Sequence, residues 1–278
     1  MGLRLLYYVF ILMLTSSGTW SVSFAQQALF LDVDYIDTRI DSDKRDRLDI
    51  YMPTNAADVP VVVYFHGGAL SAGSKENGHV VAQEIIKQDI GFVSANYRLS
   101  PNISHPVHVQ DAAAAVAWVL RNIHHYGGDS QNVYVSGHSS GAYLATLLQL
   151  DSRYLQEQGF ELSDIKGAIP ISPFLYVEET AAVRDKTVWG TDPTNWLNAS
   201  VRHKIGKLMA PIQVIYADGD ADWRKDQINR FVAAMRAVGN KGVEATEVNN
   251  RNHLSLVTAV DSTDDKVAGL IAKFVKGK

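Results

Sequence analysis

The segment Gly137 to Gly141 reads Gly-His-Ser-Ser-Gly and fits the G-x-S-x-G pattern of a nucleophilic serine. An apolar run at 133–135 precedes it, and an apolar stretch typical of a helix follows from Tyr143. A serine at such a strand–turn–helix junction projects from the end of the sheet, and flanking glycines let strand and helix approach closely. We therefore predict that Ser139 is a nucleophile, supported by Gly137 and Gly141.

A second glycine motif, His66-Gly67-Gly68-Ala69, directly follows a run of valine, tyrosine and phenylalanine. Attack of a serine on a carbonyl group creates an oxyanion, which fixed N–H donors must stabilise. We assign this role to the backbone N–H groups of Gly68, Ala69 and Ser140, with Gly67 as the close alternative. His66 is expected to brace the loop through a hydrogen bond and to take no part in the chemistry.

A serine hydroxyl needs a base to accept its proton, and that base is usually histidine. The chain has nine histidines, but only His253 follows the last predicted strand. In chains with this kind of serine turn, the catalytic groups follow in the order serine, acid, histidine. His253 is therefore the predicted base.

The acid should follow the strand predicted at 212–217, where three aspartates occur within five residues. Asp220 is the best placed, because the chain beyond the strand end can turn back toward His253. Asp222 is the alternative acid, and Asp218, almost within the strand, comes third. The chosen aspartate would accept the Nδ1 proton of the histidine and fix its tautomer.

These aspartates also have the D-x-D-x-D spacing of a calcium loop, but Trp223 stands where such a loop needs glycine. We therefore predict no metal ion, and the serine chemistry needs no cofactor. The absence of cysteine excludes disulfides, thiolate chemistry and cysteine-ligated metals. A net charge of −4 gives no reason to expect nucleic acid or an anionic membrane as a partner.

The elements that must position these residues follow an alternating pattern. After residue 30, short β-rich runs alternate with helical periodicity, which predicts an α/β fold with about eight mostly parallel strands and helices on both faces. The strands are expected near 32–35, 48–51, 61–65, 91–95, 133–137, 167–171, 212–217 and 243–248, with helices at 110–123, 226–238 and 264–275. The stretch 174–210 is the least regular and is either a lid or pocket wall, or an ordinary loop with a short surface helix.

Residues 1–25 have the features of a cleavable signal peptide. Arg4 is followed by an apolar region at 5–14 and by the small-x-small site Ser23-Phe24-Ala25. We expect a mature protein from Gln26, secreted or periplasmic, with no stable membrane insertion after cleavage. The alternative is an uncleaved membrane anchor.

Five segments together resemble the esterase/lipase branch of the α/β-hydrolases. The resemblance is closest to the feruloyl/acetyl-xylan esterase-like enzymes, the hormone-sensitive-lipase-like esterases and the kynurenine formamidases. It covers roughly residues 34–275, which implies a single hydrolase domain over 26–278. The segments are Leu48-Asp49-Ile50-Tyr51-Met52-Pro53, His66-Gly67-Gly68-Ala69, Asn96-Tyr97-Arg98-Leu99-Ser100-Pro101, Gly127-Gly128-Asp129 and Gly137-His138-Ser139-Ser140-Gly141.

The resemblance implies a serine carboxylic ester hydrolase that works through an acyl-enzyme. Ala69 replaces the third glycine of the lipase motif, and no large N-terminal cap precedes the first strand, so a small soluble acyl ester is the expected substrate. An amidase or arylformamidase with the same triad is the alternative, and a non-catalytic binding protein is the alternative of another class. Trp189, Trp196 and Trp223 either contact substrate or only pack.

Overall fold

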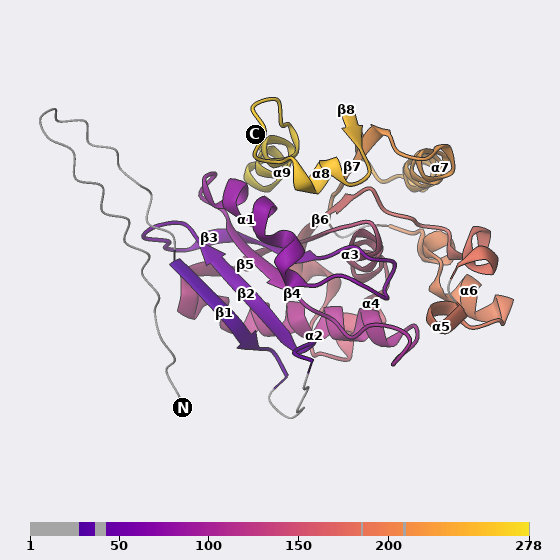
Figure 1. Cartoon of the computed structure of the whole chain (residues 1–278), viewed down its shortest axis with the longest axis horizontal. Coiled ribbons are helices and arrows are strands. Elements are labelled where there is room, and N and C mark those ends of the chain that lie inside the picture. The colour runs from indigo at the N-terminus through magenta and orange to yellow at the C-terminus, as the bar shows by residue number, and fades with distance from the viewer. Residues whose placement is uncertain (1–27, 37–42, 185, 208–209, 278) are drawn as a thin grey trace, which may run out of the picture.

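The computed structural model describes residues 28–36, 43–184, 186–207 and 210–277. Within them, eight strands form one sheet in the order β1-β2-β4-β3-β5-β6-β7-β8 (Figure 1). Strand β2 runs antiparallel to β1 and β4, and every other neighbouring pair is parallel. The predicted mostly parallel, eight-stranded sheet is confirmed. The strands are β1 (Ala28–Asp34), β2 (Arg47–Met52), β3 (Val59–Phe65), β4 (Gly91–Ala95), β5 (Gly128–His138), β6 (Ile165–Ile171), β7 (Ile212–Gly219) and β8 (Val243–Asn252).

From β3 onward helices alternate with the strands, as predicted, whereas β1, β2 and β3 follow one another with no helix among the described residues between them. The α-helices are α1 (His79–Ile86), α2 (Val107–Asn122), α3 (Ser140–Leu150), α4 (Ser152–Gln156), α5 (Lys186–Trp189), α6 (Pro193–Ala199), α7 (Asp222–Ala237), α8 (Ser255–Thr258) and α9 (Val267–Lys276). Short 3-10 turns are η1 (Lys75–Gly78), η2 (Ile123–Tyr126), η3 (Leu162–Asp164), η4 (Val177–Glu179), η5 (Ala181–Val183) and η6 (Val201–Lys204). Among the described residues, none of the helices combines the length and the apolar character needed to span a bilayer.

Strand β3 shows why an unbroken apolar run forms the centre of this sheet. Val61, Val63 and Phe65 belong to the core beneath α2, α3 and α7. Val62 and Tyr64 belong to the second core, beneath α1, α8 and α9 on the opposite face. Successive side chains of a strand point to opposite faces, so a strand covered on both sides must be apolar throughout. Figure 1 shows α1 and α9 on one side of the sheet and α2 on the other.

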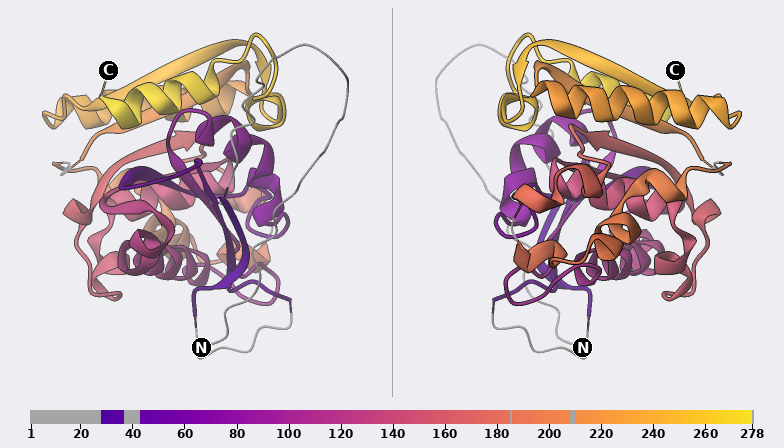
Figure 2. Two further views of the ribbon diagram at one scale, coloured as in Figure 1. Left: turned by 90° about the vertical axis from the view of Figure 1, so that its left-hand side faces the viewer. Right: turned by 90° about the vertical axis from the view of Figure 1, so that its right-hand side faces the viewer.

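The irregular stretch predicted from residue 174 contains several short helices and 3-10 turns. Helices α5 and α6 and the 3-10 turns η4 to η6 lie together beyond α3 (Figure 1), and the right-hand view of Figure 2 shows them on the near face. Trp189 at the end of α5 is 4% exposed and meets the ring of Tyr143 edge-on. This segment is therefore packed onto the domain through aromatic contacts. The predicted signal peptide, residues 1–25, lies outside the described residues.

Candidate active site

Ser139 occupies a tight turn between β5 and α3. Its φ of 54° and ψ of −111° are unusual for a residue with a side chain, and such strained positions persist only where the surroundings impose them. Here the Ser139 N–H donates to the Ile171 carbonyl oxygen at 2.9 Å. A Cβ atom added to Gly141 would lie 2.0 Å from the Phe65 carbonyl oxygen, and one added to Gly137 would lie 2.5 Å from the Gly141 carbonyl carbon. Both glycines are thus sterically required by the turn.

Asp220 and His253 lie in direct contact at the carboxyl ends of β7 and β8. His253 Nδ1 is 2.8 Å from Asp220 Oδ1, and the Asp220 side chain is completely buried, with 0% exposure. The Asp222 side chain, in contrast, is fully exposed, at 103% of its reference area. Asp220 is therefore the aspartate that meets the histidine, and Asp222 points into solvent.

The environment of Asp220 keeps its carboxylate charged. Burial alone would raise the pKa of Asp220, but hydrogen bonds from His253, Ser172 and the Ala217 N–H outweigh burial and lower it. The Ala217 N–H donates to Asp220 Oδ2 at 2.9 Å. A charged, buried carboxylate on Nδ1 holds the ring in the tautomer that leaves Nε2 available to accept a proton.

Asp218, the third sequence candidate, has a different position. Its carboxylate accepts hydrogen bonds from the Asn250 N–H at 2.9 Å and the Arg251 N–H at 3.0 Å. These contacts tie the end of β7 to the end of β8, two residues before His253. Asp218 thereby holds the strand that carries the histidine and does not reach the imidazole.

Two residues that the sequence did not single out complete the surroundings of the acid. The Ser172 hydroxyl donates to Asp220 Oδ2 and lies 3.1 Å from His253 Nδ1. Arg224 Nη1 donates to the Ser172 carbonyl oxygen at 2.7 Å, and its Nε is 3.6 Å from Asp220 Oδ1. Burial lowers the pKa of Arg224 to about 10. The one signal available was that Ser172 immediately follows a buried strand, where ligand sites of parallel sheets occur.

The loop after β3, residues 66–74, is called the glycine loop below. Gly68, Ala69 and Leu70 all have positive φ angles, of 125°, 56° and 64°. A Cβ atom on Gly68 would lie 2.1 Å from the Ala72 carbonyl oxygen, and one on Gly67 would lie 3.3 Å from Ser139 Cβ. The loop therefore turns tightly beside the serine.

The amides assigned to the oxyanion are available for a ligand. Within the described residues, no protein acceptor takes a hydrogen bond from the backbone N–H of Gly68, Ala69 or Ser140. Ser140 begins α3, so its N–H lies at the positive end of the helix dipole. These three donors, on two neighbouring segments, are suited to binding a negative oxygen.

His66 is buried inside the glycine loop. Its ring stacks on Tyr97 with centroids 4.3 Å apart, and Nδ1 is 2.8 Å from the Gly67 carbonyl oxygen. Burial lowers the pKa of His66 to about 4, so the ring is neutral near pH 7. The Tyr97 hydroxyl donates to the His66 carbonyl oxygen at 2.8 Å. These contacts hold the loop in shape.

His138, the residue before the serine, touches the histidine loop. Its Nε2 donates to the His253 carbonyl oxygen at 2.8 Å, and the two rings have centroids 4.5 Å apart. Burial and then the nearby His253 lower the pKa of His138 to about 3. A neutral imidazole therefore joins the serine turn to the segment that carries His253.

Comparison with known proteins supplies the family. The profile of the BD-FAE family matches residues 48–220, more than half of the chain. The chain belongs to the BD-FAE family. The match covers the glycine loop, the serine turn and Asp220, and it ends before His253.

Three curated relatives of this BD-FAE chain are hydrolases of different kinds. The kynurenine formamidase of Danio rerio is 26% identical over 269 residues, which cover 93% of this chain and 86% of that protein. The isoprenylcysteine alpha-carbonyl methylesterase ICME of Arabidopsis thaliana is 27% identical, over 76% of this chain and 54% of that protein. Esterase LipQ of Mycobacterium tuberculosis is 29% identical, over 70% of this chain and 50% of that protein. The chain thus spans about half the length of the last two.

Solved structures show the same fold. A truncated carbohydrate esterase from gut microbiota superimposes with a TM-score of 0.77 at 17% identity, covering 94% of this chain and 99% of that one. Esterase B from Lactobacillus rhamnosis also gives 0.77, at 16% identity, with 90% and 87% covered. Together with the family match and the esterase relatives, the BD-FAE chain is a serine hydrolase of the α/β-hydrolase fold, as the sequence predicted.

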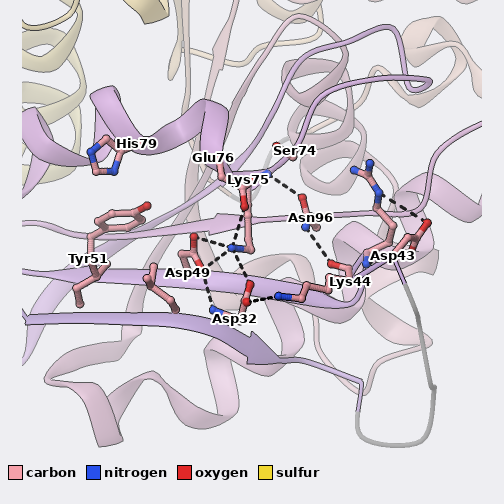
Figure 3. A pocket seen from close by; sticks show the side chains of 13 residues that line it. Asp32, Asp43, Lys44, Asp49, Tyr51, Ser74, Lys75, Glu76, His79 and Asn96 are labelled. Atoms are coloured by element: carbon pink, nitrogen blue, oxygen red, sulfur yellow. Dashed lines mark hydrogen bonds and ion pairs between the residues drawn. The ribbon is translucent and has the colours of Figure 1, made fainter. Parts of the chain in front are cut away.

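The BD-FAE chain also has a charged cavity of about 490 Å³, away from the candidate site, beside β1, β2 and η1 (Figure 3). Figure 3 shows Lys75 at its centre: Nζ lies 2.8 Å from both Asp49 oxygens and 3.0 Å from Asp32 Oδ1. The Lys75 N–H donates to Asn96 Oδ1 at 2.7 Å. Because Lys75 directly follows the glycine loop, this buried ion cluster anchors the end of the loop to the sheet.

Proposed function

We propose that this BD-FAE enzyme hydrolyses carboxylic esters of small acyl groups through an acyl-enzyme, with Ser139 as nucleophile, His253 as base and Asp220 as acid. The observation that carries the proposal is the 2.8 Å contact between His253 Nδ1 and the buried Asp220 carboxylate, beside the serine turn. It leaves Nε2 of the base to interact with the serine hydroxyl.

In the proposed reaction, Ser139 Oγ attacks the ester carbonyl carbon while His253 takes the hydroxyl proton. The carbon–oxygen bond to the alcohol then breaks as His253 delivers that proton to the leaving oxygen. Water attacks the acyl-enzyme in the same way, releasing the carboxylic acid and restoring the serine. The N–H groups of Gly68, Ala69 and Ser140 stabilise the oxyanion in both halves, each worth about 10²–10³ in rate.

Hydrolysis of p-nitrophenyl acetate by the protein from Gln26, beside Ser139→Ala, tests the proposal. Turnover that disappears in the variant supports the serine-esterase mechanism. Turnover that survives in a folded Ser139→Ala protein rejects Ser139 as the nucleophile. Lengthening the acyl chain in the same assay then measures the preference for small acyl groups.

Amide hydrolysis is the second candidate function. The kynurenine formamidase of Danio rerio matches 93% of this chain, and the same groups would cleave a formyl amide through the same intermediate. An N-formyl aryl amine offered beside a phenyl ester separates the two functions. A higher kcat/KM for the formamide would replace the ester proposal with the amide one.

We also propose that the protein is exported and cleaved between Ala25 and Gln26. The support is the sequence pattern of residues 1–25 alone. N-terminal sequencing of the expressed protein tests it: a mature chain that begins at Gln26 fits the proposal, and one that retains residues 1–25 contradicts it.

A further inference from the structure

Arg184 has an unusual environment for an arginine. Its guanidinium carbon lies 4.1 Å from the ring centroid of Phe174 and 5.6 Å from that of Trp223. Its Nε donates to the Thr180 hydroxyl at 2.7 Å, the one hydrogen bond that the guanidinium group makes within the described chain. Burial lowers the pKa of Arg184, and among the residues that the structure describes no carboxylate raises it again. A half-buried guanidinium group is thus held between two aromatic rings with donors to spare.

Other arginines of the described residues differ from Arg184 in having an acid or a carbonyl oxygen as partner. The pairs are Arg45 with Gly73, Arg47 with Asp34, Arg98 with Asp111, Arg121 with Gln158, Arg153 with Asp151, Arg202 with Glu178, Arg224 with Ser172, Arg230 with Glu179, Arg236 with Val243 and Arg251 with Asp264. The two glutamates nearest to Arg184 in sequence, at 178 and 179, are thus already engaged. A partly buried cation without an acid is costly unless a ligand supplies the missing charge.

Arg184 is linked to the helix of the candidate nucleophile through two packed rings. Phe174 stacks on Tyr143, with centroids 4.8 Å apart and planes 13° from parallel. Tyr143 belongs to the first turn of α3, where its N–H donates to the Ser139 carbonyl oxygen at 3.1 Å. The guanidinium group is therefore connected to the helix turn that begins at the serine by the buried rings of Phe174 and Tyr143.

Trp223, the second ring beside Arg184, is followed in the chain by Arg224, which contacts the surroundings of Asp220. Trp223 is the second residue of α7 and is 40% exposed, so its ring forms part of the surface. Arg224 lies 4.6 Å from the same ring and is close enough to Arg184 for their charges to repel. Because Arg224 is already bound to Ser172 and faces Asp220, Arg184 is the cation of the two that can bind a ligand.

From this arrangement we propose that Arg184 forms an anion-binding subsite and that the enzyme acts on esters that carry a carboxylate, with the exposed ring of Trp223 stacking against the rest of the substrate. The inference rests on the proposed esterase function and narrows its substrate class. A planar guanidinium group binds a carboxylate with two parallel hydrogen bonds, and burial between aromatic rings strengthens them. The carboxylate can belong to the alcohol part or to the acyl part of the ester.

Two pairs of substrates distinguish these positions. On the alcohol side, para-acetoxybenzoate is compared with the neutral para-acetoxybenzamide. On the acyl side, the monophenyl ester of adipic acid is compared with its terminal amide. Each kcat/KM is divided by the rate of hydroxide-catalysed hydrolysis, so that differences in intrinsic reactivity cancel.

The wild type should favour the anionic member of one pair by about tenfold, since a charge-assisted hydrogen bond changes binding by about that much. In Arg184→Gln the ratio should fall to about one, while Arg184→Lys retains part of it. Arg121→Gln is the matched control: Arg121 also lies over an aromatic ring, 4.8 Å from that of Phe160, but on α2. Its anionic-to-neutral ratio should equal that of the wild type.

The outcomes separate this inference from the function on which it rests. If the neutral esters are hydrolysed and the ratio in both pairs is near one, or is unchanged by Arg184→Gln, the anion subsite is wrong and the esterase function stands. If no ester of either pair is hydrolysed by the wild type, the esterase function itself fails. A ratio that falls equally in the Arg121 control would assign the preference to overall charge and also reject the subsite.

Discussion

The Nε2 atom of His138 donates a hydrogen bond to the backbone carbonyl oxygen of His253 across 2.8 Å. This contact joins the residue before the predicted nucleophile to the predicted base itself. Because a carbonyl oxygen can only accept, the neutral His138 ring must carry its proton on Nε2. The distance between the serine turn and the histidine loop thus depends on one buried side chain.

Replacing His138 should therefore slow catalysis without removing a catalytic group. In His138→Phe the His253 carbonyl loses its donor, and kcat for p-nitrophenyl acetate should fall about tenfold, the equivalent of one lost hydrogen bond. His138→Gln keeps an N–H donor and should recover much of the loss. Equal activity in the two variants, both with the melting temperature of the wild type, would show that the hydrogen bond does not position the base.

Asp220 and Asp222 give the sharpest test of the proposed acid. Asp220→Asn removes the charge that orients and stabilises the imidazolium, so kcat should fall by about 10⁴-fold. Asp222→Asn changes a fully exposed side chain and should leave kcat within about twofold, as surface substitutions usually do. Steady-state kinetics on one ester measures both. The reverse pattern would transfer the role to Asp222.

Ser172 should affect the rate through the acid. Ser172→Ala removes a donor to Asp220, so the carboxylate becomes more basic and holds the His253 proton more tightly. We expect kcat to fall about tenfold, with the free energy of unfolding lower by about 1 kcal/mol. The acidic limb of the kcat/KM profile should move to higher pH, a shift that purely structural damage would not produce. An unmoved limb would contradict the positioning role.

Gly141 and Gly269 form a matched pair for the steric argument. A Cβ atom on Gly141 would lie 2.0 Å from the Phe65 carbonyl oxygen, whereas one on Gly269, exposed on α9, would meet no atom within 4 Å. Gly141→Ala should lower the free energy of unfolding by about 3 kcal/mol or more. Gly269→Ala should raise it by about 0.5–1 kcal/mol, because alanine favours helix. Urea titration measures the free energy of unfolding of both variants. Similar changes in the two would show that a Cβ atom at Gly141 causes no steric clash.

The buried histidines predict how stability changes with pH. Burial lowers the pKa of His66 and His108 to about 4 and that of His105 and His138 to about 3, whereas in the unfolded chain each is near its usual 6.5. Since the folded pKa is the lower one, the stabilising effect is complete above pH 6.5 and is lost as the pH falls toward the folded values.

Between about pH 6 and pH 5, unfolding should take up close to one proton per buried histidine, so the free energy of unfolding should fall by roughly 1.4 kcal/mol per pH unit for each. Urea titrations at pH 7, 6 and 5 measure the slope. His138→Gln should reduce the slope by about a quarter, because one of four such groups is gone. A stability that does not change between pH 7 and pH 5 would contradict the neutral burial of these rings.

The sheet could be predicted from sequence because its signals are local. The run at 61–65 is apolar throughout, and the structure places alternate residues of it in two different cores. The serine turn was predictable for a similar reason, since Gly137 and Gly141 stand on either side of Ser139. Helix α1 was not predicted, because its eight residues give only about two turns of periodicity.

The partners of the candidate site could not be predicted in the same way. Ser172 meets Asp220 across 48 positions, and His138 meets His253 across 115. Such contacts arise because β5, β6, β7 and β8 are neighbours in the sheet. The order of strands in a sheet cannot be inferred from a short stretch of sequence. Arg184 is also unremarkable in sequence, and only the packing of Phe174 and Trp223 around it distinguishes it from other arginines.

Strand β8 leads directly into the predicted base and lies at the edge of the sheet, where β7 is its one neighbouring strand among the described residues. Edge elements open at a lower free energy than the centre of a fold. A molecule in which only β8 has come away would keep the core around β3 and β5 intact, yet its serine would have no base. Mild heat or denaturant should therefore abolish turnover before any probe of the protein core reports a change. An activity assay then measures the local opening of β8 and not the global unfolding of the protein.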